Sequence, residues 1–178
     1  DEIARLDADM GALCTLLAPW IPAGAELHAL SELDTFVPEP IHCARTMAMY
    51  MPGRKQAQIE AFTGCLPTHQ GPYLEWCAGK GHLGHLLARD GTTLTCLEHD
   101  PDMVEDVQRL SQRLKLDDQH QQQDVMATEC AQHLTTAHTP VALHACGDLH
   151  VQLMHLASAA GCAQVAIAPC CYNRTLAS

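Results

Sequence analysis

Positive charge is scarce in this sequence. The 178 residues include 10 Lys and Arg against 21 Asp and Glu, which gives a formal net charge of −11. Beyond Lys115, the sole Lys or Arg is Arg174. Proteins that bind nucleic acid unaided cluster Lys and Arg against the phosphates, so the C-terminal half of this chain cannot form a basic groove. If the substrate is RNA, another segment or subunit must hold it.

Long apolar runs are also missing from the sequence. No stretch approaches the roughly 20 apolar residues that span a bilayer, and no charged-then-apolar signal opens the chain. Several of the ten cysteines, among them Cys77 and Cys96, fall inside apolar runs, where a free Cys behaves as a small hydrophobe. We expect a reduced, cytoplasmic protein without membrane association. Because the chain starts at Asp1 without Met, we expect a fragment or a trimmed terminus.

The composition is that of a globular protein with one core. Hydrophobic residues make up 47% of the chain and charged residues 17%. Apolar residues at three- and four-residue steps predict an amphipathic helix over residues 1–19, and a second helix is expected from Pro52 to Phe62. We therefore expect a helical appendage over residues 1–70 and a folded core over residues 71–178.

After Pro72, short apolar strands alternate with helical segments. The expected strands are 73–77, 93–98, 121–125, 141–146 and 164–169, and the expected helices are 83–89, 101–114, 127–134 and 149–160. Asp100 is expected to cap one helix, and Asp148 to lie in the first turn of another. This alternation predicts an α/β fold, a Rossmann-like doubly wound parallel sheet.

The fifth expected strand lies close to the end of the chain and would form an apolar edge of the sheet. Exposed apolar edges invite pairing with other strands. We expect the N-terminal helices, a partner in a homodimer or a missing C-terminal segment to cover it.

The most informative motif connects the first expected strand to the helix that follows. It reads Glu-Trp-Cys-Ala-Gly-Lys-Gly-His-Leu-Gly from Glu75 to Gly84. Gly79 and Gly81 allow the backbone to approach a ligand closely, although an ordinary strand-to-helix turn would also use them. With Gly84 they match the Gly-x-Gly-x-x-Gly spacing of dinucleotide-binding turns, so a nicotinamide or flavin oxidoreductase stays open as an alternative.

A carboxylate about 20 residues further on strengthens this interpretation. Glu98 ends the second expected strand, where it can accept hydrogen bonds from both hydroxyls of a ribose. Asp124, at the end of the third expected strand, can accept from an adenine amino group while Val125 packs on the ring. A solvated acid at a strand end is the alternative interpretation of Asp124.

These residues resemble the seven-stranded S-adenosylmethionine-dependent methyltransferases, whose first motif is commonly acid-x-Gly-x-Gly-x-Gly. Cys77 stands at the first of these glycines. The blocks Leu-His-Ala-Cys-Gly at 143–147 and Pro-Cys-Cys-Tyr at 169–172 resemble a subgroup of this family, the methyltransferase domain of glutathione S-transferase C-terminal domain-containing and methyltransferase-like proteins. The resemblance covers about residues 50 to 175 and implies the strand order 3-2-1-4-5, with final strands missing.

The resemblance also implies S-adenosylmethionine as the cofactor. The implied cofactor site consists of Glu75, Cys77, Gly79, Gly81, Glu98, His99, Asp124, Val125 and His144. The expected activity is methyl transfer to an acceptor that the sequence does not identify, with RNA and a small molecule as candidates. A catalytically silent binding module with the same fold is the alternative.

A second group of polar residues follows the fourth and fifth expected strands. Cys146, Cys170, Cys171 and Asn173 are expected to line a substrate pocket, and His144, Asp148 and Tyr172 are candidates to orient or deprotonate the acceptor. Plain strand-end packing and a zinc or redox site are the alternatives for the cysteines. Adjacent residues of a strand point to opposite faces, which argues against one ion between Cys170 and Cys171 unless the chain bends after Pro169.

Histidines 82 and 85 share a predicted helix and, with His99, raise the question of a metal site. In a chain that holds 12 histidines, solvent-facing helix residues are the simpler interpretation. We therefore predict no metal ligands in this motif.

Overall fold

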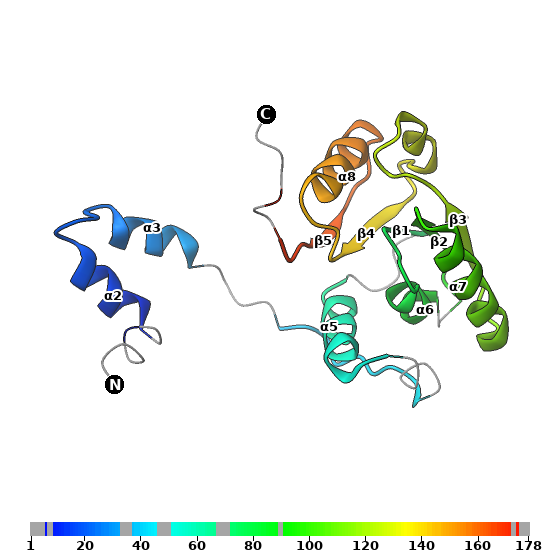
Figure 1. The fold of residues 1–178 in the computed structure, drawn as a ribbon, viewed down its shortest axis with the longest axis horizontal. Coiled ribbons are helices and arrows are strands. Elements are labelled where there is room, and N and C mark those ends of the chain that lie inside the picture. The colour runs from blue at the N-terminus through cyan, green and yellow to red at the C-terminus, as the bar shows by residue number, and fades with distance from the viewer. Residues whose placement is uncertain are drawn as a thin grey trace. The chain divides into compact units, whose positions relative to one another are not determined.

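A computed structural model gives the fold of the chain (Figure 1). It describes residues 6, 9–32, 37–45, 51–66, 72–88, 91–171 and 174. By their internal contacts these residues divide into two units, one within residues 1–37 and one within residues 38–178. No described helix has both the length and the apolar character needed to cross a membrane.

The N-terminal unit contains two short helices, α2 (Met10–Leu17) and α3 (Gly24–Ser31). Helix α2 begins after Asp9, whose carboxylate accepts a hydrogen bond from the backbone N–H of Ala12 at 2.9 Å. The helix expected over residues 1–19 is thus present from Met10 to Leu17. Residues 1–5 and 7–8 of that prediction lie outside the described residues.

The second unit is built on a parallel sheet of five strands in the order β3-β2-β1-β4-β5. The strands are β1 (Tyr73–Trp76), β2 (Leu94–Glu98), β3 (Asp118–Gln122), β4 (Thr139–Leu143) and β5 (Ala166–Ala168). This order confirms the predicted Rossmann-like fold. Because β1 pairs with both β2 and β4, its carboxyl end lies at the centre of the sheet edge.

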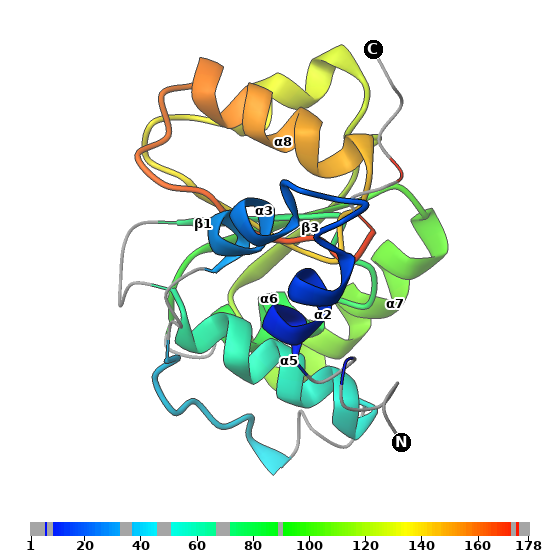
Figure 2. The ribbon, with the colours of Figure 1, turned by 90° about the vertical axis from the view of Figure 1, so that its left-hand side faces the viewer.

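Helices cover both faces of this sheet, and Figure 2 shows α8 on one side and α5, α6 and α7 on the other. Their bounds are α5 (Gly53–Gly64), α6 (His82–Leu87), α7 (Pro101–Leu114) and α8 (Asp148–Ala159). On one face Ile59 of α5 and Leu86 of α6 pack against Leu94. On the other face Leu153 of α8 packs against Trp76, so alternate residues of the strands supply two separate hydrophobic cores.

Two helices begin where the sequence predicts. Asp100 caps α7 by accepting a hydrogen bond from the N–H of Asp102 at 2.9 Å, and Pro101 occupies the first helical position. Asp148 lies in the first turn of α8, after the cap residue Gly147. Both expectations are confirmed.

The third strand was placed wrongly by the sequence pattern. It covers residues 118–122 rather than 121–125, and all of its side chains are polar. The side chains of Asp118 and His120 are buried, and as an edge strand β3 tolerates polar residues at its other positions. The helix expected over 127–134 is a 3₁₀ helix, η2 (Thr128–His133).

Two strands end earlier than expected because the next residues leave the extended conformation. Cys77, after β1, has a φ of 56°, and His144, after β4, has a φ of 68°. Left-handed residues cannot continue a strand, so each chain turns into its loop at these positions. The fifth strand is likewise shorter than 164–169 and forms an edge of the described sheet.

Candidate functional site

A pocket of about 390 Å³ lies at the carboxyl ends of β1, β2 and β3. Its lining residues are Cys77, Glu98, His99, Gln123, Asp124, Val125 and Leu149. Five of these were expected from the sequence to bind a cofactor. Gln123 and Leu149 were not, although Gln123 adjoins Asp124, and Leu149 follows the loop after β4 at the same edge of the sheet.

Glu98 holds the glycine turn from the neighbouring strand. Its Oε2 accepts a hydrogen bond from the N–H of Gly79 at 2.7 Å. Its Oε1 accepts from the N–H groups of His99 and Asp100, at 2.8 and 3.0 Å. A carboxylate offers about four acceptor positions, so one position on Oε2 remains for a ligand hydroxyl while this arrangement persists. Binding of both ribose hydroxyls would require one of these backbone donors to move.

The turn itself depends on glycine. Gly79 and Gly81 have φ values of 57° and 64°, where side chains with a Cβ are strained. A Cβ on Gly81 would also collide with Val107. Cys77 takes up a similar left-handed conformation without being glycine. Burial, aided by the negative charge of Glu98, raises the pKa of the Cys77 thiol to about 12, so a neutral thiol lines the pocket.

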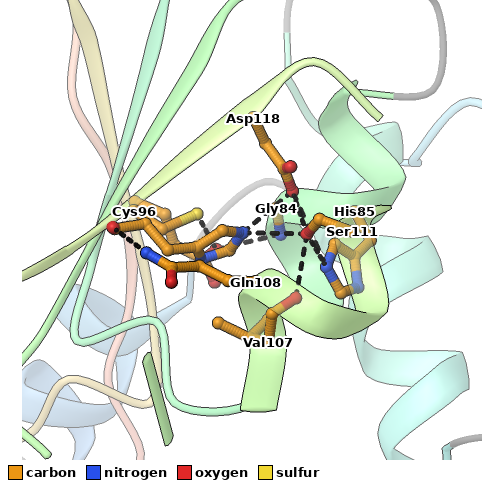
Figure 3. A network of polar contacts seen from close by, with 9 residues as sticks. Gly84, His85, Cys96, Val107, Gln108, Ser111 and Asp118 are labelled. Atoms are coloured by element: carbon orange, nitrogen blue, oxygen red, sulfur yellow. Dashed lines mark hydrogen bonds and ion pairs between the residues drawn. The ribbon is translucent and has the colours of Figure 1, made fainter. Parts of the chain in front are cut away.

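Glu75 lies beneath the turn rather than in the pocket lining. Its Oε2 accepts hydrogen bonds from the N–H of Gly84 at 3.0 Å and from the thiol of Cys96 at 3.3 Å. Gly84 and Cys96 are labelled in Figure 3. A Cβ on Gly84 would lie 2.5 Å from this oxygen. Gly84 is therefore needed for close packing of α6 on the sheet, which explains it without a pyrophosphate.

Burial also changes the acidity of Glu75. It raises the pKa of this carboxyl to about 7, while the hydrogen bonds from Cys96 and Gly84 act in the opposite direction. Glu75 thus holds the start of α6 and the adjoining turn in place from inside the fold.

His144 lies outside the pocket lining, at the end of β4. Its backbone N–H donates to the carbonyl of Ala168 at 3.0 Å, and its Nε2 lies 3.2 Å from Oε1 of Gln58 on α5. Its side chain is exposed. Asp148 is half-buried in the first turn of α8. The predicted residues Tyr172 and Asn173 lie outside the described residues.

The three cysteines predicted for the substrate pocket lie together. Sγ of Cys146 is 2.9 Å from Sγ of Cys170, which is 3.6 Å from Sγ of Cys171. Cys170 and Cys171 follow the end of β5, where the chain bends, so the opposite-faces argument for neighbouring strand residues does not apply. A hydrogen bond from the Cys170 thiol and further bonds from two backbone N–H groups lower the pKa of Cys146.

A buried polar cluster on the α6 and α7 side of the sheet was not foreseen (Figure 3). Ser111 is its centre, with Oγ 2.9 Å from Nε2 of His85, 3.1 Å from Nε2 of His120 and 2.8 Å from Oδ2 of Asp118. His120 also lies 2.9 Å from the same carboxylate oxygen. The hydrogen bonds from His120 and Ser111 outweigh the effect of burial and lower the pKa of Asp118.

The solvent-facing interpretation of the two helix histidines is wrong. His82 and His85 are 6% and 2% exposed, because α6 is buried on all of its positions between the sheet and its neighbours. Burial lowers the pKa of each to about 4. His99 lines the 390 Å³ pocket instead, so the suggested set of three histidines is not brought together.

A comparison with protein families matches residues 54–177 to a family model described as a methyltransferase domain. The comparison with curated proteins finds no match. Solved structures similar to the chain include TehB from Haemophilus influenzae, at 11% identity and a TM-score of 0.44 over 52% of this chain and 33% of that one.

Two further solved structures show the same range of similarity. An S-adenosylmethionine-dependent methyltransferase from Clostridium acetobutylicum has 13% identity and a TM-score of 0.40, over 52% of this chain and 39% of that one. The PH0226 protein from Pyrococcus horikoshii has 11% identity and a TM-score of 0.46, over 64% and 58%. The chain spans less than two thirds of the length of each of these three proteins.

Proposed function

Because the chain belongs to the methyltransferase family whose model matches residues 54–177, we propose that it transfers the methyl group of S-adenosylmethionine to an acceptor. The observation that carries the cofactor assignment is the pocket of about 390 Å³ with Glu98 and Asp124 at two neighbouring strand ends. This volume falls within the range of pockets that hold small ligands.

The lining residues suit the nucleoside half of the cofactor. Glu98 keeps an acceptor position for a ribose hydroxyl beside Gly79. Asp124 accepts from the adenine amino group, and the apolar side chains of Val125 and Leu149 pack on the ring. The cofactor has no phosphate, which agrees with the absence of Lys and Arg among the described residues that line this pocket.

Methyl transfer needs little from the protein beyond alignment. The acceptor's nucleophile would attack the methyl carbon in line with the carbon–sulfur bond, which would break to release S-adenosylhomocysteine, and most of the rate gain would come from holding the two reactants together. Acceptors would enter beside the ends of β4 and β5, where His144 is exposed and Asp148 begins α8. His144 is the preferred proton acceptor because its ring is accessible and lies on a fixed backbone, bonded to Ala168.

Calorimetric titration with S-adenosylmethionine and S-adenosylhomocysteine tests this proposal. We expect micromolar binding that weakens in Asp124→Asn and is lost in Glu98→Ala, and that is retained in Glu129→Gln, an exposed acid outside the pocket. NADH should not compete. Tight NADH binding, or no binding of either sulfur compound to the folded protein, would contradict the proposal.

The acceptor and turnover need a separate measurement. Transfer of labelled methyl from S-adenosylmethionine to total RNA or to a small-molecule extract would identify the acceptor class. With a net charge of −11, the chain is expected to bind RNA weakly on its own, so RNA should be presented at low salt. Cofactor binding with no transfer to either extract would favour a silent binding module.

A further inference from the structure

Three thiols meet where the loops after β4 and β5 come together. Cys146 is three residues beyond the end of β4, and Cys170 and Cys171 follow the end of β5. Their three Sγ atoms all lie within 4.8 Å of one another. Cys146 and Cys170 are 24 positions apart in the sequence, so the fold, and not their closeness along the chain, brings these thiols together.

The backbone around the three thiols favours a thiolate at Cys146. Sγ of Cys146 accepts hydrogen bonds from the N–H groups of Cys170 and Cys171, at 3.1 and 3.2 Å. Two N–H dipoles aimed at one sulfur stabilise negative charge on it, as they do for metal-bound sulfur. Plain apolar packing of a half-buried cysteine would not call for either bond.

The two loops are also fixed to each other. Gly147 has a φ of 63°, and a Cβ there would lie 2.7 Å from the carbonyl oxygen of Arg174. The N–H of Arg174 in turn donates to the carbonyl of Cys171 at 3.2 Å. Arg174 therefore packs directly on the turn after Cys146 and is bonded to Cys171, which ties the two loops together.

The spacing of the sulfurs fits a shared metal ion better than a disulfide. Thiolates bonded to tetrahedral zinc at about 2.3 Å lie roughly 3.8 Å apart, whereas disulfide sulfurs lie about 2.05 Å apart. The separation of 3.6 Å between Cys170 and Cys171 is close to the first value. The separation of 2.9 Å between Cys146 and Cys170 would widen on metal binding, which the exposed side chain of Cys170 permits.

We propose that Cys146, Cys170 and Cys171 bind one Zn²⁺ through their thiolates, with a water molecule as the fourth ligand. Soft sulfur ligands select zinc over the hard cations Mg²⁺ and Ca²⁺. Within the described part of the chain, no other His, Cys, Asp or Glu joins this group. Three protein ligands with one exchangeable position is the pattern of zinc sites that also take part in chemistry.

This site does not depend on the proposed cofactor. It lies at the carboxyl ends of β4 and β5, whereas the lining of the 390 Å³ pocket comes from the ends of β1 to β3 and the start of α8. Zinc binding can therefore be measured without S-adenosylmethionine, and either proposal can fail while the other stands.

The test is a Zn²⁺ titration of the reduced, metal-free full chain against a colorimetric chelator, followed by Co²⁺ substitution. We expect one ion per chain and the sulfur-to-cobalt charge-transfer absorption of a thiolate site. Each of Cys146→Ser, Cys170→Ser and Cys171→Ser should weaken binding by at least roughly tenfold. Cys65→Ser, which replaces an exposed cysteine elsewhere in the same unit, should bind like the wild type.

Two controls keep the outcome decisive. His85→Gln disrupts the other group of metal-type ligands, His85, Asp118 and His120, and should leave the zinc affinity unchanged. Thermal melts would show that the cysteine variants are folded. Zinc binding that survives all three cysteine variants, or that is lost only in His85→Gln, overturns the proposal. A Cys146–Cys170 disulfide in the protein as purified, with no zinc bound after reduction, also overturns it.

Discussion

Gly79 donates its backbone N–H to the carboxylate of Glu98 at 2.7 Å, across 19 positions of the sequence. The acid expected to bind the ribose thus also holds the glycine turn beside the 390 Å³ pocket. Under the proposed function, this one side chain would link the stability of the turn to cofactor affinity.

Glu98→Gln removes the negative charge of this side chain but keeps its size and shape. The amide retains one oxygen and places an NH₂ group against one of the three backbone donors, Gly79, His99 or Asp100. We expect a loss of about 1.5–3 kcal/mol in the free energy of unfolding, the usual contribution of hydrogen bonds to a charged group. Urea denaturation with and without S-adenosylhomocysteine measures both effects. An unchanged midpoint in the absence of ligand would show that these bonds do not support the turn.

Gly84→Ala should be strongly destabilising. The added methyl group would meet Oε2 of Glu75 at 2.5 Å and Leu94 at 2.7 Å, both within a packed core. Overpacking of this kind costs about 1–3 kcal/mol. Gly53→Ala is the matched control, because a Cβ there meets nothing within 4 Å and alanine favours the helix that begins at this residue. Equal unfolding midpoints for the two variants would contradict the packing argument.

Glu75→Gln should change how stability depends on pH. Burial raises the pKa of Glu75 to about 7, from an ordinary 4.5. Between these values the folded protein keeps a proton that the unfolded chain has released, so stability is lost as pH rises from 4.5 to about 7. Relative to wild type, the variant should therefore gain up to ~3 kcal/mol between pH 5 and pH 8.

Chemical denaturation across this pH range checks the prediction. A Glu75→Gln variant whose stability changes with pH in the same way as that of the wild type would contradict it. The contribution of His85 to the free energy of unfolding changes at lower pH and with the opposite sign. Burial lowers its pKa to about 4, so its contribution to stability is lost as pH falls from 6.5 to 4.

Ser111→Ala should destabilise the fold by removing the centre of the buried cluster. Its hydroxyl lies within 2.9 Å of both His85 and Asp118, and their side chains are 3% and 0% exposed. Leaving buried polar groups without this partner costs about 1–3 kcal/mol. Ser158→Ala, on the exposed side of α8, should be neutral or slightly stabilising in the same denaturation assay. A neutral Ser111→Ala variant would mean that the cluster contributes little to folding.

The strand order was implied by the family resemblance, whereas most of the residues that line the pocket could be predicted because their signals are local. Each strand end carries its own polar residue, and parallel strands place those ends along one edge of the sheet, as Glu98 and Asp124 illustrate. The position of β3 could not be predicted because an edge strand without aliphatic residues has no hydrophobic period to read.

The buried cluster escaped the sequence analysis for a different reason. His85, Ser111 and His120 come from α6, α7 and β3, and no spacing along the chain marks them as neighbours. The packing of α7 against β3 brings them together, and only that packing distinguishes a buried histidine from a solvent-facing one. The contact of Glu98 with Gly79 is similar, since the sequence placed both residues near a ligand but did not reveal their mutual hydrogen bond.

Trp76 gives the protein an optical reporter of its own. The indole is fully buried, and its Nε1–H donates to the carbonyl of Leu149 at 3.0 Å, a residue that lines the 390 Å³ pocket. The second of the two tryptophans, Trp20, is 75% exposed in the N-terminal unit. Their emission spectra should differ in wavelength, so fluorescence can follow ligand occupancy through Trp76 while Trp20 remains accessible to a soluble quencher.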